Sequence, residues 1–162
     1  MRDPYIEAMR EDALIAAADI AEGAMIALVP SAADCERLAV EGGEPVDQLH
    51  LTLVYLGDAV DFDDADRAAL ISAGEDMVKG WESVAGEAFA PALFNPTGPE
   101  PCAVMLCSGA ELAEIYETCM ADVTEIVELP PDLHAPWIPH VTLKYADMAK
   151  PAYEFVAIED LA

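Results

Sequence analysis

The chain has 162 residues, of which 54% are hydrophobic, 32 are acidic and 7 are basic, giving a formal net charge of −25. This length fits one domain with an ample core, and no apolar run approaches the roughly 18 residues of a membrane-spanning helix. Long nucleic acids are not expected as partners, because proteins that grip polyanions use arrays of Lys and Arg. A solvated, solubilising surface, for example one suited to a saline habitat, explains the negative charge at least as well as a functional role does.

The N-terminal segment is rich in alanine and acidic residues and has apolar residues at a helical spacing. These residues are Ile6, Met9, Ala13 and Ala17. We expect residues 1–23 to be a helical extension packed on the domain or an arm that docks on a protein partner, and residues 24–162 to form a single domain. The segment is too acidic for a secretory signal.

The four cysteines make no Cys-x-x-Cys pair and lie in apolar runs. They are Cys35, Cys102, Cys107 and Cys119. Reduced, buried thiols are expected from this pattern. Together with the acidic N-terminal segment, they favour a cytoplasmic protein, which would lie in the host cytoplasm if the source is viral.

Strands and helices are expected to alternate in the first part of the domain. The expected elements are a buried strand at 25–29, a helix beginning at Ser31 with Asp34 as a capping box and closed by Gly42-Gly43, a strand at 49–56, a helix at 63–81 and a strand within 83–94. The inward stripe of the second helix is expected at Leu70, Ala73, Met77 and Trp81.

The second part begins with a stretch that holds four prolines. The expected elements are a loop at 91–101, a strand at 102–107, a helix capped by Ser108 and Glu111 that ends before Pro130, a proline-rich loop at 130–139, a strand from His140 and a last strand at 153–158. This helix has an apolar stripe at Leu112, Ile115, Cys119 and Val123. The order of elements predicts an α+β fold of two similar halves with a cleft between them.

One pattern, His-x-Thr-Leu-x-Tyr, occurs twice, at 50–55 and at 140–145. Each copy lies in a strand-like run, where successive side chains point to opposite faces. His and Thr of each copy therefore share one face, whereas Tyr55 and Tyr145 are expected to face the core. Two such strands side by side would present two imidazoles and two hydroxyls to one cleft.

These groups suit phosphodiester chemistry. One neutral imidazole can take a proton from an attacking oxygen while the other, protonated, gives one to the leaving oxygen. The hydroxyls of Thr52 and Thr142 would bind the phosphoryl oxygens. No metal site is expected, because no cluster of His, Cys and carboxylates has metal-ligand spacing, and no cofactor is needed.

Four further residues bear on the expected site. Lys144 is expected on the face of Thr142, where its charge would attract a phosphate, although a lysine that points outward at a strand end is an equal alternative. Phe94 and Trp137 stand in the proline-rich loops, where an aromatic ring could stack on a base. Packing beneath the loop is favoured for Trp137. His134 belongs to neither motif and is interpreted as a loop residue.

The two motifs resemble the signature of the 2H phosphoesterase superfamily, also called the LigT-like or 2′-5′ RNA ligase-like family, which has phage members. The resemblance starts near Ala24 and includes Trp137-Ile138-Pro139 before the second motif and Leu56-Gly57-Asp58 after the first. It implies two pseudo-symmetric halves whose antiparallel sheets form a central cleft, with helices outside. It also implies that His50 and His140 are the acid and base, in either order.

We therefore expect a metal-independent phosphodiesterase that acts on a small nucleotide: a 2′,3′-cyclic phosphate, a 2′-5′ oligonucleotide or a cyclic oligonucleotide signal. One alternative is a nucleotide-binding sponge or sensor without turnover. Another is a structural or virion assembly protein that carries the same fold and uses residues 1–23 for docking. A membrane partner is not expected.

Overall fold

The computed structural model describes residues 23–79, 81, 83–98, 100–131 and 135–145. Within these ranges the chain is of the α+β class, as predicted, with a five-stranded antiparallel sheet and three α-helices. The predicted N-terminal extension up to residue 22, His134 and the predicted strand at 153–158 lie outside the described residues. None of the helices in the described ranges has the length and apolar character that crossing a bilayer requires.

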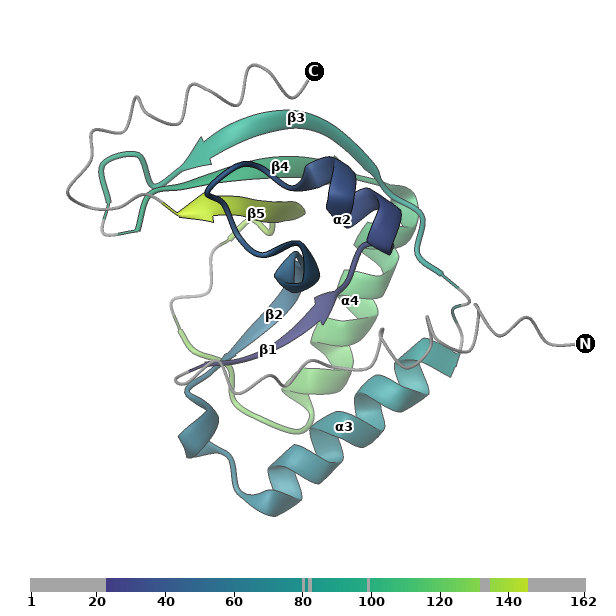
Figure 1. Cartoon of the computed structure of the whole chain (residues 1–162). Coiled ribbons are helices and arrows are strands. Elements are labelled where there is room, and N and C mark those ends of the chain that lie inside the picture. Colours follow the sequence, from purple (N-terminus) through teal and green to yellow (C-terminus); the bar gives the residue numbers. More distant parts are fainter. Residues whose placement is uncertain (1–22, 80, 82, 99, 132–134, 146–162) are drawn as a thin grey trace, which may run out of the picture. The chain divides into compact units, whose positions relative to one another are not determined.

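The strands follow one another in the sheet in the order β1-β2-β5-β4-β3. Figure 1 shows β3, β4 and β5 side by side. Their bounds are Ala24–Leu28 for β1, Leu51–Gly57 for β2, Glu87–Phe94 for β3, Cys102–Ser108 for β4 and His140–Tyr145 for β5. The helices are α2 (Ala32–Leu38), α3 (Asp64–Lys79) and α4 (Ala110–Thr124), and short 3-10 turns lie at Val46–Gln48 and Ala59–Asp61.

The chain divides into two compact units. The first contains the described residues of Met1–Val29, Thr52–Gly86 and Gly109–Trp137, and the second those of Pro30–Leu51, Glu87–Ser108 and Ile138–Ala162. Both histidines of the repeated motif, His50 and His140, fall in the second unit.

In the first unit, helix α4 buries its apolar stripe as predicted. Its buried residues are Leu112, Ile115, Cys119 and Val123. Helix α3 differs from the prediction, because its buried residues are Leu70 and Gly74, while Ala73 and Met77 are only partly buried and Trp81 lies beyond the helix end. The predicted cap at Ser108 is also wrong. Helix α4 starts after Gly109 without a side-chain cap, and the Glu111 carboxylate instead accepts the Ala85 N–H at 2.6 Å.

In the second unit, β3 pairs antiparallel with β4 and β4 with β5, and Val104, Val141 and Leu143 of these strands are buried. Strand β3 extends through Pro91 to Phe94, so the prediction that a loop begins at residue 91 is wrong. Pro91 lies opposite Met105, and β3 is the outermost described strand on its side of the sheet. Proline has no N–H to donate, and an outer strand tolerates it because that N–H needs no partner in the sheet.

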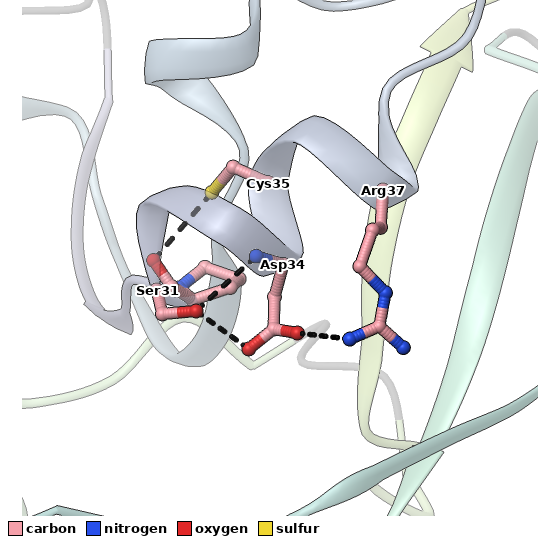
Figure 2. A network of polar contacts seen from close by, with 5 residues as sticks. Ser31, Asp34, Cys35 and Arg37 are labelled. Atoms are coloured by element: carbon pink, nitrogen blue, oxygen red, sulfur yellow. Dashed lines mark hydrogen bonds and ion pairs between the residues drawn. The ribbon is translucent and has the colours of Figure 1, made fainter.

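Helix α2 begins as predicted (Figure 2). The Ser31 hydroxyl oxygen accepts the Asp34 N–H at 3.2 Å, and the hydroxyl donates to the Asp34 carboxylate at 2.7 Å. The same carboxylate accepts a hydrogen bond from Arg37 at 3.1 Å. The predicted end at Gly42-Gly43 is wrong, because the helix ends at Leu38 and Ala39 caps it.

Gly42 and Gly43 form a turn that meets strand β5. The backbone φ of Gly42 is +67°, a left-handed conformation that glycine adopts without strain. A Cβ on Gly43 would overlap the carbonyl oxygen of Leu143, and the N–H of Glu44 donates to that same oxygen at 2.8 Å. The glycine pair therefore permits a close contact between this turn and β5.

The four cysteines are free thiols, as predicted, and all but the half-buried Cys107 are buried. Burial raises the pKa of each thiol from the ordinary value of 9.0, and it raises the pKa of Cys119 in α4 to about 12. At a pH between 9.0 and about 12, the Cys119 thiol has lost its proton in the unfolded chain but retains it in the folded chain.

This difference predicts how stability depends on pH. Where the folded state binds more protons, the free energy of unfolding falls as the pH rises. We expect it to fall above pH 9 and toward pH 12, and the fall to be shallower in Cys119→Ala. Chemical denaturation at a series of pH values measures both slopes. An unchanged slope in Cys119→Ala would contradict the assignment to this thiol.

Candidate active site

The pairing of β2 with β5 brings the two motif histidines together. Leu51 lies opposite Val141 in this antiparallel pair, and His50 and His140 each precede one of these residues. The two histidines therefore occupy diagonal positions on the face opposite to the buried Leu51 and Val141. Diagonal neighbours in a sheet lie about 7–8 Å apart, a spacing across which aromatic and long side chains can still interact. The same register places Thr142 directly opposite His50.

Each histidine is held in the same way. His50 Nδ1 lies 2.7 Å from the carbonyl oxygen of Gln48, and His140 Nδ1 lies 2.7 Å from the carbonyl oxygen of Ile138. In both cases the carbonyl belongs to the residue two before the histidine. A carbonyl oxygen can only accept, so Nδ1 carries the proton and the lone pair of the neutral ring is on Nε2. Both histidine residues are half-buried.

A bulge in β5 changes which side chains lie on the same sheet face as Thr142. Val104 of β4 lies opposite Thr142, whereas the preceding residue Ala103 lies opposite Lys144, so Leu143 is an extra residue in β5. Adjacent residues of β4 point to opposite faces. Thr142 and Lys144 are therefore on opposite faces, and the expectation that Lys144 shares the face of Thr142 is wrong. The Lys144 ammonium lies near Gly42, at 3.5 Å from the place of a Cβ there.

The bulge also moves Tyr145 out of the core. Tyr145 lies opposite Cys102, two residues from Val104 on β4, and so shares the face of Thr142. The residue is 52% exposed, so the prediction that it faces the core is wrong. Partial burial of the phenol raises its pKa from the ordinary value of 10.0, and a side-chain hydrogen bond with Thr142 acts in the opposite direction. Tyr145 is the residue on this face that sequence alternation missed.

Phe94 approaches His140 from β3. Phe94 lies opposite Cys102, which places it on the same face as Tyr145 and Thr142. The ring centroids of Phe94 and His140 are 4.7 Å apart, with an angle of 59° between the ring planes. Phe94 is the last residue of β3 and not part of a loop, and its ring contacts a motif histidine.

The remaining motif residues lie in the first unit. Thr52 follows Leu51 and therefore points to the same face of its strand as His50. Its hydroxyl donates to Met25 Sδ at 3.7 Å, a weak hydrogen bond. Tyr55 is 41% exposed, so the prediction that it faces the core is wrong. The residues directly before and after it, Val54 and Leu56, are buried instead.

Trp137 packs against other residues of the first unit, in agreement with the sequence-based expectation. Its indole N–H donates to the carbonyl oxygen of Thr52 at 3.1 Å, and its ring stacks on Tyr116 with centroids 4.1 Å apart and an interplanar angle of 1°. Both contacts lie within the first unit. The ring face on Tyr116 is thus occupied, which favours a structural role over stacking on a base.

Two other features of the described residues lie outside this site. A depression of about 600 Å³ in the first unit is lined by residues that include Asp61, Asp66 and Glu128, and no motif residue contributes to it. Among the residues that the structure describes, no three His, Cys, Asp or Glu side chains are grouped so that they could hold a metal ion.

Comparisons with protein family models, with curated proteins and with solved structures found no match for this chain. The resemblance to the 2H phosphoesterases is therefore carried by the motif residues themselves. The described geometry gathers His50, His140, Thr142, Tyr145 and Phe94 in one unit.

Proposed function

We propose that the chain is a phosphodiesterase of the two-histidine type. The observation that carries the proposal is the matched pair of histidines on adjoining strands, each with Nδ1 bound to the carbonyl oxygen two residues before it. Such an arrangement fixes the tautomer of both neutral rings. It leaves two Nε2 atoms available to the same small group.

The chemistry follows from the tautomers. The lone pair on Nε2 of one neutral histidine takes a proton from a water molecule, whose oxygen forms a bond to phosphorus. The bond from phosphorus to the leaving ribose oxygen breaks, and Nε2–H of the other histidine, in its protonated form, gives that oxygen a proton. The net reaction adds one water molecule across a P–O bond. Thr142, opposite His50, donates its hydroxyl to a phosphoryl oxygen, and Thr52 has the same role in the proposal.

The proposed substrate is a small nucleotide with a cyclic or 2′-linked phosphodiester. A net charge of −25 opposes long RNA or DNA, because a small site offers few contacts to offset that repulsion. The proposal includes the finer architecture implied by the resemblance, with two pseudo-symmetric halves and a central cleft, and a cytoplasmic location. It assigns no role in phosphate binding to Lys144.

Turnover of a nucleotide panel tests this function. The full chain is incubated with nucleoside 2′,3′-cyclic phosphates, 2′-5′ oligoadenylates and cyclic oligonucleotides, and the products are identified by mass spectrometry. We expect at least one class to gain the mass of one water molecule per bond cleaved. A nucleotide that binds without any product would favour the sponge or sensor alternative. The absence of both binding and turnover across the panel would contradict the proposal.

The charge of the chain predicts an unusual dependence on salt. A net charge of −25 repels an anionic substrate, and salt screens this repulsion as the Debye length falls to about 10 Å at 0.1 M. We expect kcat/KM to rise from low to moderate salt, whereas enzymes that grip nucleic acids with Lys and Arg lose affinity. A neutral phosphotriester substrate analogue is the control for general effects of salt. A steep fall in kcat/KM with added salt would reopen longer RNA as the substrate.

A further inference from the structure

The two motif histidines differ in one respect. Among the aromatic contacts within the described residues, His140 has a ring partner, Phe94, and His50 has none. The carbonyl oxygen of Ile138 fixes one edge of the His140 ring through Nδ1. A single hydrogen bond still allows the ring to swing about the axis of that bond, so a second contact is needed to fix its plane.

Phe94 is placed to supply that contact. It is half-buried, and the turn that follows it holds its backbone: Asn95 has a φ of 50°, and the Gly98 N–H donates to the Asn95 carbonyl oxygen at 2.9 Å. Asparagine tolerates this left-handed conformation better than most residues, so the turn ends β3 directly after Phe94. The tilted geometry with centroids 4.7 Å apart is among the favoured arrangements of aromatic rings.

We propose that Phe94 is a positioning residue for His140: its ring contacts the imidazole and fixes the plane in which Nε2 points at the phosphate. This differs from a role in stacking on the base of a nucleotide. The kinetic part of the inference rests on the proposed function, whereas the ring contact is independent of it. Positioning of this kind matters because a small misplacement of a reacting group costs up to about a hundredfold in rate.

Kinetics separate positioning from base stacking. We expect Phe94→Ala to lower kcat about ten- to a hundredfold with little change in KM, and Phe94→Tyr, which keeps the ring, to restore most of it. A cyclic phosphodiester without a base, such as methyl ribofuranoside 2′,3′-cyclic phosphate, should show the same loss. A loss seen only with nucleotides, or one confined to KM, would overturn the proposal in favour of stacking.

A spectroscopic readout works whether or not turnover is found. In proton NMR spectra of the full chain, the ring current of Phe94 should displace the Hε1 signal of His140, and Phe94→Ala should shift that signal while His50 stays in place. Phe94→Leu serves as a second variant if the alanine variant unfolds. Phe89→Ala is the matched control, because Phe89 lies in the same strand and is 57% exposed. An unmoved His140 signal in both Phe94 variants would overturn the ring contact even if the enzyme proves active.

Discussion

Alanine at His50 or at His140 is expected to lower kcat/KM by about 100- to 10,000-fold while the melting temperature changes little. The rate should fall because, in the proposed mechanism, each imidazole moves a proton in the transition state. Stability changes little because each ring is only half-buried and its hydrogen bond to a carbonyl is exposed. Steady-state kinetics and thermal unfolding of the same samples measure the two effects. The double variant should be little less active than the less active single variant, because in the proposed mechanism both residues serve one proton circuit.

Asparagine at each position sharpens this test. The side-chain amide of His50→Asn or His140→Asn can still donate to the carbonyl that Nδ1 contacts, but it has no titratable nitrogen in place of Nε2. Activity should therefore stay as low as in the alanine variants. His134→Ala, which removes the one histidine outside the motifs, controls for histidine loss. An asparagine variant that keeps most activity would show that the rings hold the backbone and do not transfer protons.

Gly43→Ala is expected to cost about 1–3 kcal/mol of folding free energy, the range for forcing extra atoms into a packed site. The new Cβ would overlap the Leu143 carbonyl oxygen, and it would lie 2.5 Å from Cγ2 of Val40. A backbone oxygen cannot move aside without disturbing β5, so the hydrogen bond from the Glu44 N–H should weaken too. Urea denaturation measures the loss. Activity should also fall, because the bulge at Leu143 sets the face of Thr142 and Tyr145.

Gly42→Asn is the matched control in the same turn. Asparagine tolerates its φ of +67°, and a Cβ at residue 42 would lie 3.5 Å from the flexible Lys144 ammonium, an ordinary contact distance. This variant should lose well under half of the stability that Gly43→Ala loses. Equal losses in both variants would mean that the turn tolerates no side chain at either position, and the specific contact with Leu143 would lose its support.

The sequence predicts well wherever one periodic pattern decides the structure. The apolar stripe of α4 is buried as its helical spacing requires, and Ser31 caps α2 because a hydroxyl before a helix satisfies a free backbone N–H. The repeated motif identified the two histidines that β2 and β5 bring to one face. These features depend on residues close in sequence, or on a pattern that repeats.

Contacts between distant segments account for the errors. The bulge at Leu143, whose carbonyl oxygen accepts the Glu44 N–H from about a hundred residues away, reverses the faces of Lys144 and Tyr145. Pro91 signals a loop locally, but it belongs to β3 because an outer strand tolerates a missing N–H. Likewise, Phe94 meets His140 only because both β3 and β5 pair with β4.

The central claim is that His50 and His140 serve one phosphate site. Ring nitrogen NMR of the ¹⁵N-labelled chain, titrated with a nucleoside 2′-monophosphate, tests it most directly. We predict that the neutral rings carry their proton on Nδ1, and that the Nε2 signals of both histidines shift together with one shared Kd. A response from only one histidine, two different Kd values, or a proton on Nε2 in the neutral rings would contradict the claim.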